Sequence, residues 1–187
     1  MPNNRKLFTV TLWLLRAGII WTKVSIVMMV LGVAIMIYWL SASPSVFDGI
    51  AHAMGPTVTA DEYVRLQLAL GANGTGIVTL LLLIFRALRR VVASASVGDP
   101  FIEANAVDLV RVAWLLLGLH VFVALMQPMI SHFEPVGMDA KAHQTAYVSI
   151  LLAVTVIPNQ LPVLLIFVLA QVFRRGSDMR AELAGTI

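Results

Sequence analysis

The stretch Val24–Leu40 restricts the fold most, because its 17 residues carry no charged side chain. About 17–25 apolar residues suffice for a helix to cross the hydrocarbon of a bilayer. The whole chain is 59% hydrophobic and 12% charged, whereas soluble domains average roughly 45–50% and about 25%. A soluble fold of this size could not bury so much apolar surface. The sequence therefore predicts an all-α integral membrane protein, a four-helix bundle in one domain, with spans at about 24–40, 66–85, 109–126 and 147–173.

Turn-forming residues separate the predicted spans into two hairpins. Pro44 should stop the first helix, since proline cannot donate to the helical hydrogen-bond ladder. The first outer loop, 41–65, and the second, 127–146, are rich in Gly, Pro and charged residues. Residues 7–23 are apolar but contain Arg16 and Lys23. This segment suits a helix at the inner interface that either turns into the first span or continues as it. A signal peptide cleaved near Ser41 is an alternative interpretation.

The charged segment 86–108 separates the two hairpins, and we interpret it as a cytoplasmic bridge. Ser94–Gly98 reads as a flexible linker. Asp99 suits an N-cap and Pro100 the first helical position, which predicts a helix from Pro100. On a helical wheel Ile102, Ala106, Leu109, Val110 and Ala113 share an apolar face, and Glu103, Asn105, Asp108 and Arg111 take the opposite face. This arrangement predicts an amphipathic start at the membrane surface.

Basic residues predict the orientation, because lysine and arginine concentrate on the cytoplasmic side of short loops. The predicted outer loops hold two of the 13 basic residues, Arg65 and Lys141. We therefore expect both termini in the cytoplasm and the protein in the plasma (inner) membrane, as a multi-pass protein. The other basic residues lie on the predicted inner side: Arg5, Lys6, Arg16, Lys23, Arg86, Arg89, Arg90, Arg111, Arg174, Arg175 and Arg180.

Two short motifs resemble those of a bacterial family of small four-span membrane proteins of unknown function. The first is Gly98-Asp99-Pro100-Phe101 with Asn105 four residues later, between the second and third spans. The second is the basic C-terminal pattern Leu169–Gly176, which contains Phe-Arg-Arg-Gly. The tail 182–187 departs from the family pattern by an extra Ala-Gly. The resemblance implies no known activity and no assigned catalytic residue. Genes of that family often neighbour a small helix-turn-helix regulator, which implies a regulatory membrane partner.

Polar residues at predicted membrane depth are the candidates for an intramembrane site. The fourth span is interrupted by Pro158 and Pro162, with Asn159 and Gln160 between them. Broken helices of this kind form substrate or ion sites in transporters, but we favour a simple kink with amides bonded to neighbouring helices. Asn73 lies among Gly71, Gly74 and Gly76, which suits either close helix packing or a pore. His120 in the third span is a functional candidate by default or a neutral, hydrogen-bonded imidazole.

No pattern nominates an enzyme. The chain lacks cysteine, which excludes disulfides, thiol nucleophiles and Cys-ligated metals. It contains no hydrolase elbow, P-loop, zincin helix or dinucleotide fingerprint. The outer-loop residues His52, His132, His143, Glu134 and Asp139 match no zinc spacing, and we predict no cofactor or metal. The net charge of +3 follows from basic residues at span ends, so direct nucleic-acid binding is not expected.

The sequence leaves two leading functional hypotheses, and an enzyme ranks third. The first is a non-enzymatic regulatory or assembly partner, whose bridge and tail dock a cytosolic regulator or another membrane subunit. The docking candidates are Phe101, Asn105, Arg174 and Arg175. The inner arginines could alternatively hold anionic lipid headgroups. The second hypothesis is a small transporter or channel lined by Asn73, His120, Asn159 and Gln160. The oligomeric state is not predicted.

Overall fold

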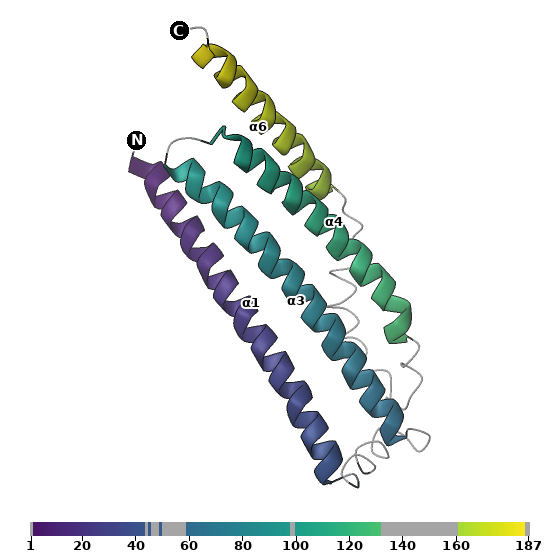
Figure 1. The fold of residues 1–187 in the computed structure, drawn as a ribbon. Helices are drawn as coiled ribbons and strands as arrows, with labels where there is room; N and C mark the ends of the chain where they lie inside the picture. The colour runs from purple at the N-terminus through teal and green to yellow at the C-terminus, as the bar shows by residue number, and fades with distance from the viewer. Residues whose placement is uncertain are drawn as a thin grey trace. The chain divides into compact units, whose positions relative to one another are not determined.

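The computed structural model describes residues 2–43, 45, 49, 59–97, 100–131 and 161–185, and four long helices account for nearly all of them. Figure 1 shows these helices, labelled α1, α3, α4 and α6. The described part of the chain contains no strand, so the all-helical prediction is confirmed. The bounds of the helices are Pro2–Ala42 for α1, Ala60–Ser96 for α3, Glu103–Ser131 for α4 and Leu161–Gly185 for α6.

The chain divides into two compact units. The first unit comprises Met1–Val24, Thr79–Leu119 and Asn159–Ile187. The second comprises Ser25–Val78 and His120–Pro158. Helices α1, α3 and α4 contribute residues to both units, and all the described residues of α6 belong to the first.

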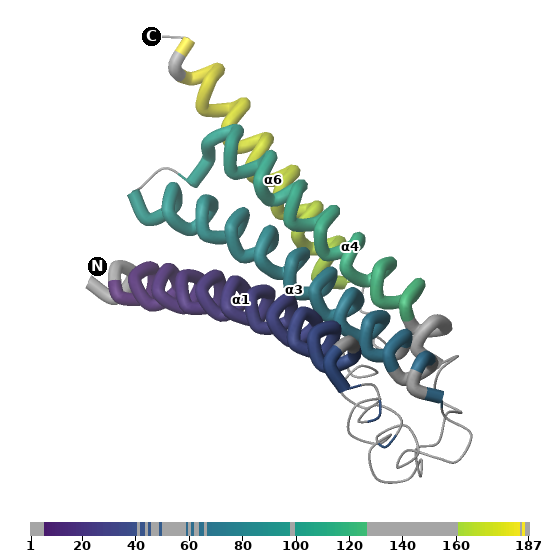
Figure 2. Tube along the Cα trace, turned by 60° about the horizontal axis from the view of Figure 1, so that its bottom comes forward, coloured from purple at the N-terminus to yellow at the C-terminus, as the bar shows by residue number. Residues whose placement is uncertain are grey.

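Helix α1 settles the two alternatives for residues 7–23, because it is continuous from Pro2 to Ala42. Figure 2 shows this tube without a break. At its end the Ser43 amide donates to the Trp39 carbonyl at 2.8 Å. A helix rises about 1.5 Å per residue, so α1 is about 60 Å long, twice the ~30 Å hydrocarbon thickness. The helix therefore extends well beyond the segment 24–40 predicted to cross the membrane.

Helix α3 is longer at both ends than the predicted second span, 66–85. It begins at Ala60, within the segment predicted as the first outer loop, and continues through the basic cluster to Ser96. The expectation of a flexible linker from Ser94 was thus wrong for Ser94–Ser96. No glycine or proline interrupts the sequence from Ile77 to Val97. Its alanine, leucine and arginine residues are good helix formers, so the basic cluster does not end the helix.

Helix α4 begins at Glu103, three residues later than the predicted start at Pro100. The backbone N–H of Asn105 donates to the Ile102 carbonyl at 3.0 Å. The wheel assignment was also wrong for two polar residues, because Asn105 and Asp108 are buried. At the other end the helix continues past Pro128 to Ser131, although Gln127-Pro128 was expected to end it. Proline removes one backbone donor, which a helix can lose near its end.

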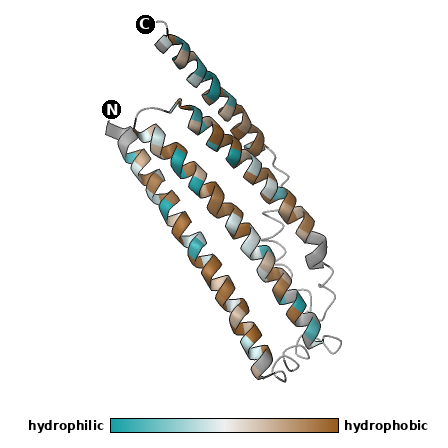
Figure 3. Cartoon of the chain, in the orientation of Figure 1, coloured by the Kyte–Doolittle hydropathy of each residue, from teal (hydrophilic) through white to brown (hydrophobic). Residues whose placement is uncertain are grey.

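Helix α6 covers only part of the predicted fourth span, 147–173. It begins at Leu161 and continues through the basic tail to Gly185. Residues 147–160, including Asn159, Gln160 and the first proline of the predicted break, lie outside the described residues. Figure 3 shows α6 changing from hydrophobic near its start to hydrophilic toward its C-terminal end.

Three helices of the described residues are long and apolar enough to cross a membrane. The candidate segments are Lys6–Leu40, Gln67–Ser96 and Glu103–Met126. Large apolar side chains such as Trp21 and Leu125 are exposed on them. In water such surfaces are costly, whereas a bilayer solvates them. These observations agree with the composition argument for a membrane protein.

The first unit has an apolar core where α3, α4 and α6 meet. Its buried residues form two clusters, one around the fully buried Val112 and the other around Leu109. Ile166 of α6 packs against both clusters. The core members from α3 are Ile84, Ala87 and Val91, and those from α4 and α6 are Leu109, Val112 and Ala170. This core sets the register of the polar contacts described next.

Candidate functional site

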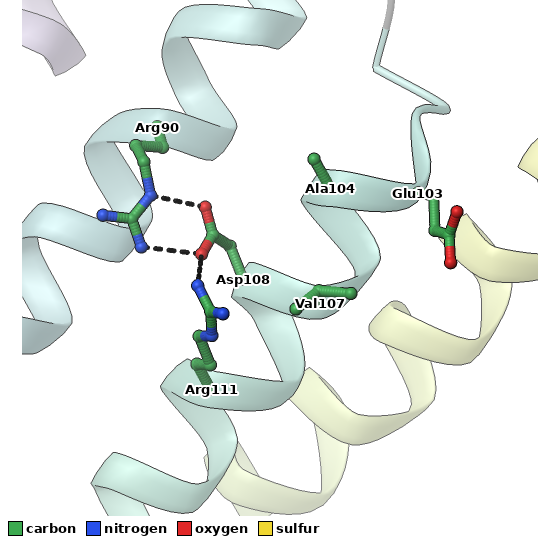
Figure 4. Close-up of a pocket in the computed structure, with 6 residues that line it drawn as sticks. All are labelled: Arg90, Glu103, Ala104, Val107, Asp108 and Arg111. Atoms are coloured by element: carbon green, nitrogen blue, oxygen red, sulfur yellow. Dashed lines mark hydrogen bonds and ion pairs between the residues drawn. The ribbon is translucent and has the colours of Figure 1, made fainter.

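The charged centre of the site is Asp108 of α4, which lies between two arginines. Arg90 of α3 donates from Nε and Nη2 to the two carboxylate oxygens of Asp108, both at 2.6 Å. Arg111, one turn further along α4, donates from Nη1 to Oδ1 at 3.2 Å. Figure 4 shows the three side chains joined by these contacts. We call this set the charged triad.

Burial of the triad is uneven. The Asp108 side chain is 8% exposed, whereas those of Arg90 and Arg111 are 56% and 63% exposed. Burying a carboxylate costs several kcal/mol unless charged partners and hydrogen bonds compensate it. The bidentate pair with Arg90 and the second contact from Arg111 supply that compensation. The triad carries two positive charges and one negative charge, so it presents a net positive charge to its surroundings.

Asn105 organises the connection between α3 and α4. Its Nδ2 group donates to the Pro100 carbonyl at 2.8 Å, and its Oδ1 lies 2.6 Å from the Ser94 hydroxyl. The same hydroxyl lies 2.8 Å from the Val91 carbonyl. A hydroxyl has one proton to donate, so these two acceptors share it. The Asn105 residue is 2% exposed. Its hydrogen bonds are thus internal and define the turn that leads into α4.

Phe101 joins this connection to α6. Its ring packs on Phe173 with the ring centroids 5.3 Å apart and the planes tilted by 48°. A Cβ built on Gly176 would lie 2.6 Å from Phe101 Cδ1 and 3.1 Å from Cγ. Such distances leave no room for a side chain at position 176. Glycine therefore allows the ring to lie directly on the α6 backbone.

An open groove of about 480 Å³ lies beside the charged triad. It is lined by Arg90 from α3 and by one face of α4 that holds Glu103, Ala104, Val107, Asp108 and Arg111. In Figure 4 the Glu103 carboxylate lies apart from the three joined charged groups. The groove therefore has a basic end and a separate acidic end, with small apolar side chains between them.

The four predicted docking residues all lie in the first unit. Phe101 is exposed, and Arg174 and Arg175, which follow its partner ring Phe173 in the sequence, are exposed on α6. Asn105 is buried and bonded within its own turn. The structure thus brings Phe101 next to the basic tail, while Asn105 supports the turn on which Phe101 lies.

The predicted intramembrane polar residues fall elsewhere. Asn73 belongs to the second unit, where it is 5% exposed, and its buried Oδ1 has no hydrogen-bond partner among the described residues. His120 is half-buried in the second unit. Asn159 and Gln160 lie outside the described residues, as do the predicted outer-loop histidines His52, His132 and His143. Within the described part of the chain, no group of His, Cys, Asp and Glu could hold a metal ion.

The glycines around Asn73 allow close helix packing in the second unit. A Cβ on Gly74 would lie 2.6 Å from Met29 Cε of α1. A Cβ on Gly76 would lie 2.5 Å from Phe122 Cζ of α4. Thr75 Oγ1 donates to the Gly71 carbonyl at 2.8 Å. Small residues that let neighbouring helices approach are typical of membrane bundles, and this agrees with the packing interpretation of these glycines.

Sequence reasoning did not nominate several residues that form these contacts. Arg90, Asp108, Ser94, Phe173 and Gly176 were not among the candidates, although each contacts a residue of the bridge. The signal that the sequence offered was a pair of opposite charges, Arg90 and Asp108, on two helices joined by a short connection. Positions 90 and 108 are far apart in sequence, so only the register of α3 on α4 makes them a pair.

No family model matches the chain, and no curated protein or solved structure matched it when searched. The resemblance of the Gly-Asp-Pro-Phe motif to a four-span family stays a prediction.

Proposed function

We propose that the chain is an integral membrane protein that acts without catalysis, as a regulatory or assembly partner, through its bridge and C-terminal tail. One observation carries the proposal: Phe101 of the bridge packs on Phe173 and Gly176 of the tail helix. The two segments nominated for docking are thus in contact, and we treat them as one docking surface.

The proposed orientation places this surface in the cytoplasm, with both termini on the same side of the plasma (inner) membrane of a bacterium. The distribution of basic residues supports it, since the segment 86–111 alone carries Arg86, Arg89, Arg90 and Arg111. The chain then crosses the bilayer with the three long apolar helices and a fourth span that ends in α6.

The chemistry of the surface indicates what the partner presents. Phe101 is 42% exposed, and Arg174 and Arg175 are exposed on α6. Exposed aromatic and arginine side chains are enriched in protein interface hot spots. We infer that the partner, a cytosolic regulator or another membrane subunit, contributes an apolar side chain flanked by acidic residues.

Co-purification from native membranes tests the proposal. The double variant R174E/R175E reverses two exposed charges, so the fold should be kept while an acidic partner is repelled. The control is R180E, which reverses one charge five to six residues further along α6. We expect R174E/R175E to lose a cytosolic or membrane partner that the wild-type chain and R180E retain. Equal recovery of that partner with all three chains would rule out docking at this surface.

The buried amide of Asn73 favours a second candidate, a small transporter or channel. An unpaired buried polar oxygen costs about 1–3 kcal/mol, and intramembrane polar groups often belong to substrate or ion pathways. The predicted break at Pro158–Pro162 would supply the remaining polar groups. In proteoliposomes that report proton, Na⁺ and K⁺ flux, N73L should abolish any flux seen with the wild type. Unchanged flux, or no flux of these ions in the wild type, counts against this candidate.

A further inference from the structure

The charged triad leaves several hydrogen-bond donors unused on two arginines that line the groove. Each guanidinium has five N–H groups in a planar fork. Arg90 donates two of them to Asp108 and Arg111 donates one. Neither arginine has another hydrogen bond within the described residues. Both side chains are more than half exposed. The remaining donors are therefore available to an external acceptor.

Asp108 holds the two forks in place. The bidentate contact fixes the plane of the Arg90 guanidinium, and the contact from Arg111 draws the second fork toward the same carboxylate. A free arginine loses side-chain entropy when it orders around a ligand. Here the buried carboxylate has already ordered them. Two convergent guanidiniums with spare donors are a geometry that suits phosphate oxygens.

The surroundings of the groove suit a lipid rather than a free anion. Ala104 and Val107 provide an apolar wall. The exposed Val110 continues this wall along α4, within the apolar segment 109–126. Arg86, one turn before Arg90 on α3, adds positive charge on the same side of that helix. On the proposed membrane placement, this level of α3 and α4 coincides with the headgroups of the inner leaflet.

We propose that the groove beside the charged triad binds the phosphate of an anionic phospholipid, with Arg90 and Arg111 donating to the phosphate oxygens and an acyl chain lying along Val107 and Val110. This inference rests on the membrane placement in the proposed function and is independent of the docking partner. Glu103 lines the other end of the groove. Its carboxylate repels an anion in the groove and so weakens phosphate binding.

Quenching of Trp114 fluorescence by brominated lipids tests this site. Trp114 follows Arg111 by three residues, so the two share a face of α4, and its ring is exposed. The other three tryptophans, Trp13, Trp21 and Trp39, are exposed on α1 and are replaced by phenylalanine. The protein is reconstituted with brominated phosphatidylglycerol or brominated phosphatidylcholine, at increasing mole fractions in unbrominated phosphatidylcholine.

We expect phosphatidylglycerol to reach half-maximal quenching at a lower mole fraction than phosphatidylcholine. R111Q should raise that mole fraction by about fivefold, because one basic residue near a membrane surface contributes on that scale. R111Q keeps the bidentate pair of Arg90 and Asp108, so the fold should be kept. The matched control R89Q removes the same charge from an exposed residue that does not line the groove and should change the value by less than twofold. E103Q should lower the mole fraction.

The remaining outcomes distinguish failure of the phosphate site from failure of the membrane placement. Equal quenching by both brominated lipids overturns the phosphate site but leaves the membrane placement intact. No quenching by either lipid overturns the placement as well. An equal rise in the half-maximal mole fraction of phosphatidylglycerol in R111Q and R89Q shows general attraction to the membrane surface and overturns the site. Reversal of the phosphatidylglycerol preference by millimolar inorganic phosphate assigns the groove to a soluble phosphate and overturns the lipid.

Discussion

At the scale of single residues, Gly176 is the position that the packing constrains most. The G176A variant places a Cβ where Phe101 Cδ1 lies 2.6 Å away. The clashing atom lies at the base of the ring, so the ring or the helix has to move. We expect a loss of about 1–3 kcal/mol in unfolding free energy, as for other overpacked contacts. The measurement is denaturant unfolding of the purified protein in detergent, followed by circular dichroism.

The matched control for G176A is G118A in α4, where an added Cβ meets nothing within 4 Å. That variant should be neutral or slightly stabilising, because alanine restricts the unfolded chain more than glycine does. The double variant F101A/G176A should lose less stability than the two single variants added together. Strict additivity would show that the ring and the glycine do not interact.

The charged triad predicts that loss of Arg90 and loss of Asp108 reduce the unfolding free energy by different amounts. R90Q leaves the buried Asp108 carboxylate with the longer contact from Arg111 only, and uncompensated buried charges cost about 3–5 kcal/mol. D108N instead leaves two arginines that are more than half exposed and can be solvated. We therefore expect R90Q to reduce the unfolding free energy more than D108N does, in the same denaturant measurement. The reverse order would contradict the burial described for Asp108.

At the scale of elements, α1 is longer than a bilayer is thick, so part of it must lie outside the hydrocarbon. Because the chain has no cysteine, single-cysteine variants report one position each. Cysteines at positions 28 and 35 of the predicted span should resist a water-soluble maleimide in membranes opened to both sides. A cysteine at position 9 should react, since it lies before Arg16 and Lys23. Protection at position 9 would place the whole helix in lipid.

Sequence patterns predicted the helices better than they predicted where helices begin and end. Hydropathy identifies apolar segments because lipid solvates them, and three of the described helices contain such segments. The start of α4 at Glu103 depends instead on the bond from Asn105 Nδ2 to the Pro100 carbonyl. The burial of Asp108 depends on Arg90 of another helix. Both effects are tertiary, and a helical wheel drawn for one helix cannot include them.

At the scale of the whole molecule, the proposed topology places the α3–α4 connection and the two termini on one side of the membrane. A cysteine at Ser96 and a reporter fused after Ile187 should therefore both be cytoplasmic, because arginines flank both positions. A cysteine at Thr59, before α3, should react with an impermeant maleimide added outside intact spheroplasts. Reaction of a cysteine at Ser96 with the impermeant maleimide from outside would invert the proposed membrane topology.

The contact between Phe101 and Gly176 has a consequence for how this protein can vary in evolution. Only a hydrogen atom on the glycine separates the aromatic ring from the tail helix. A bulkier residue at 176 is tolerable once the ring has been lost, and a lost ring opens a gap that a bulkier residue can fill. Descendants of this chain should therefore change the two positions together, and an ancestor with one change alone should be short-lived.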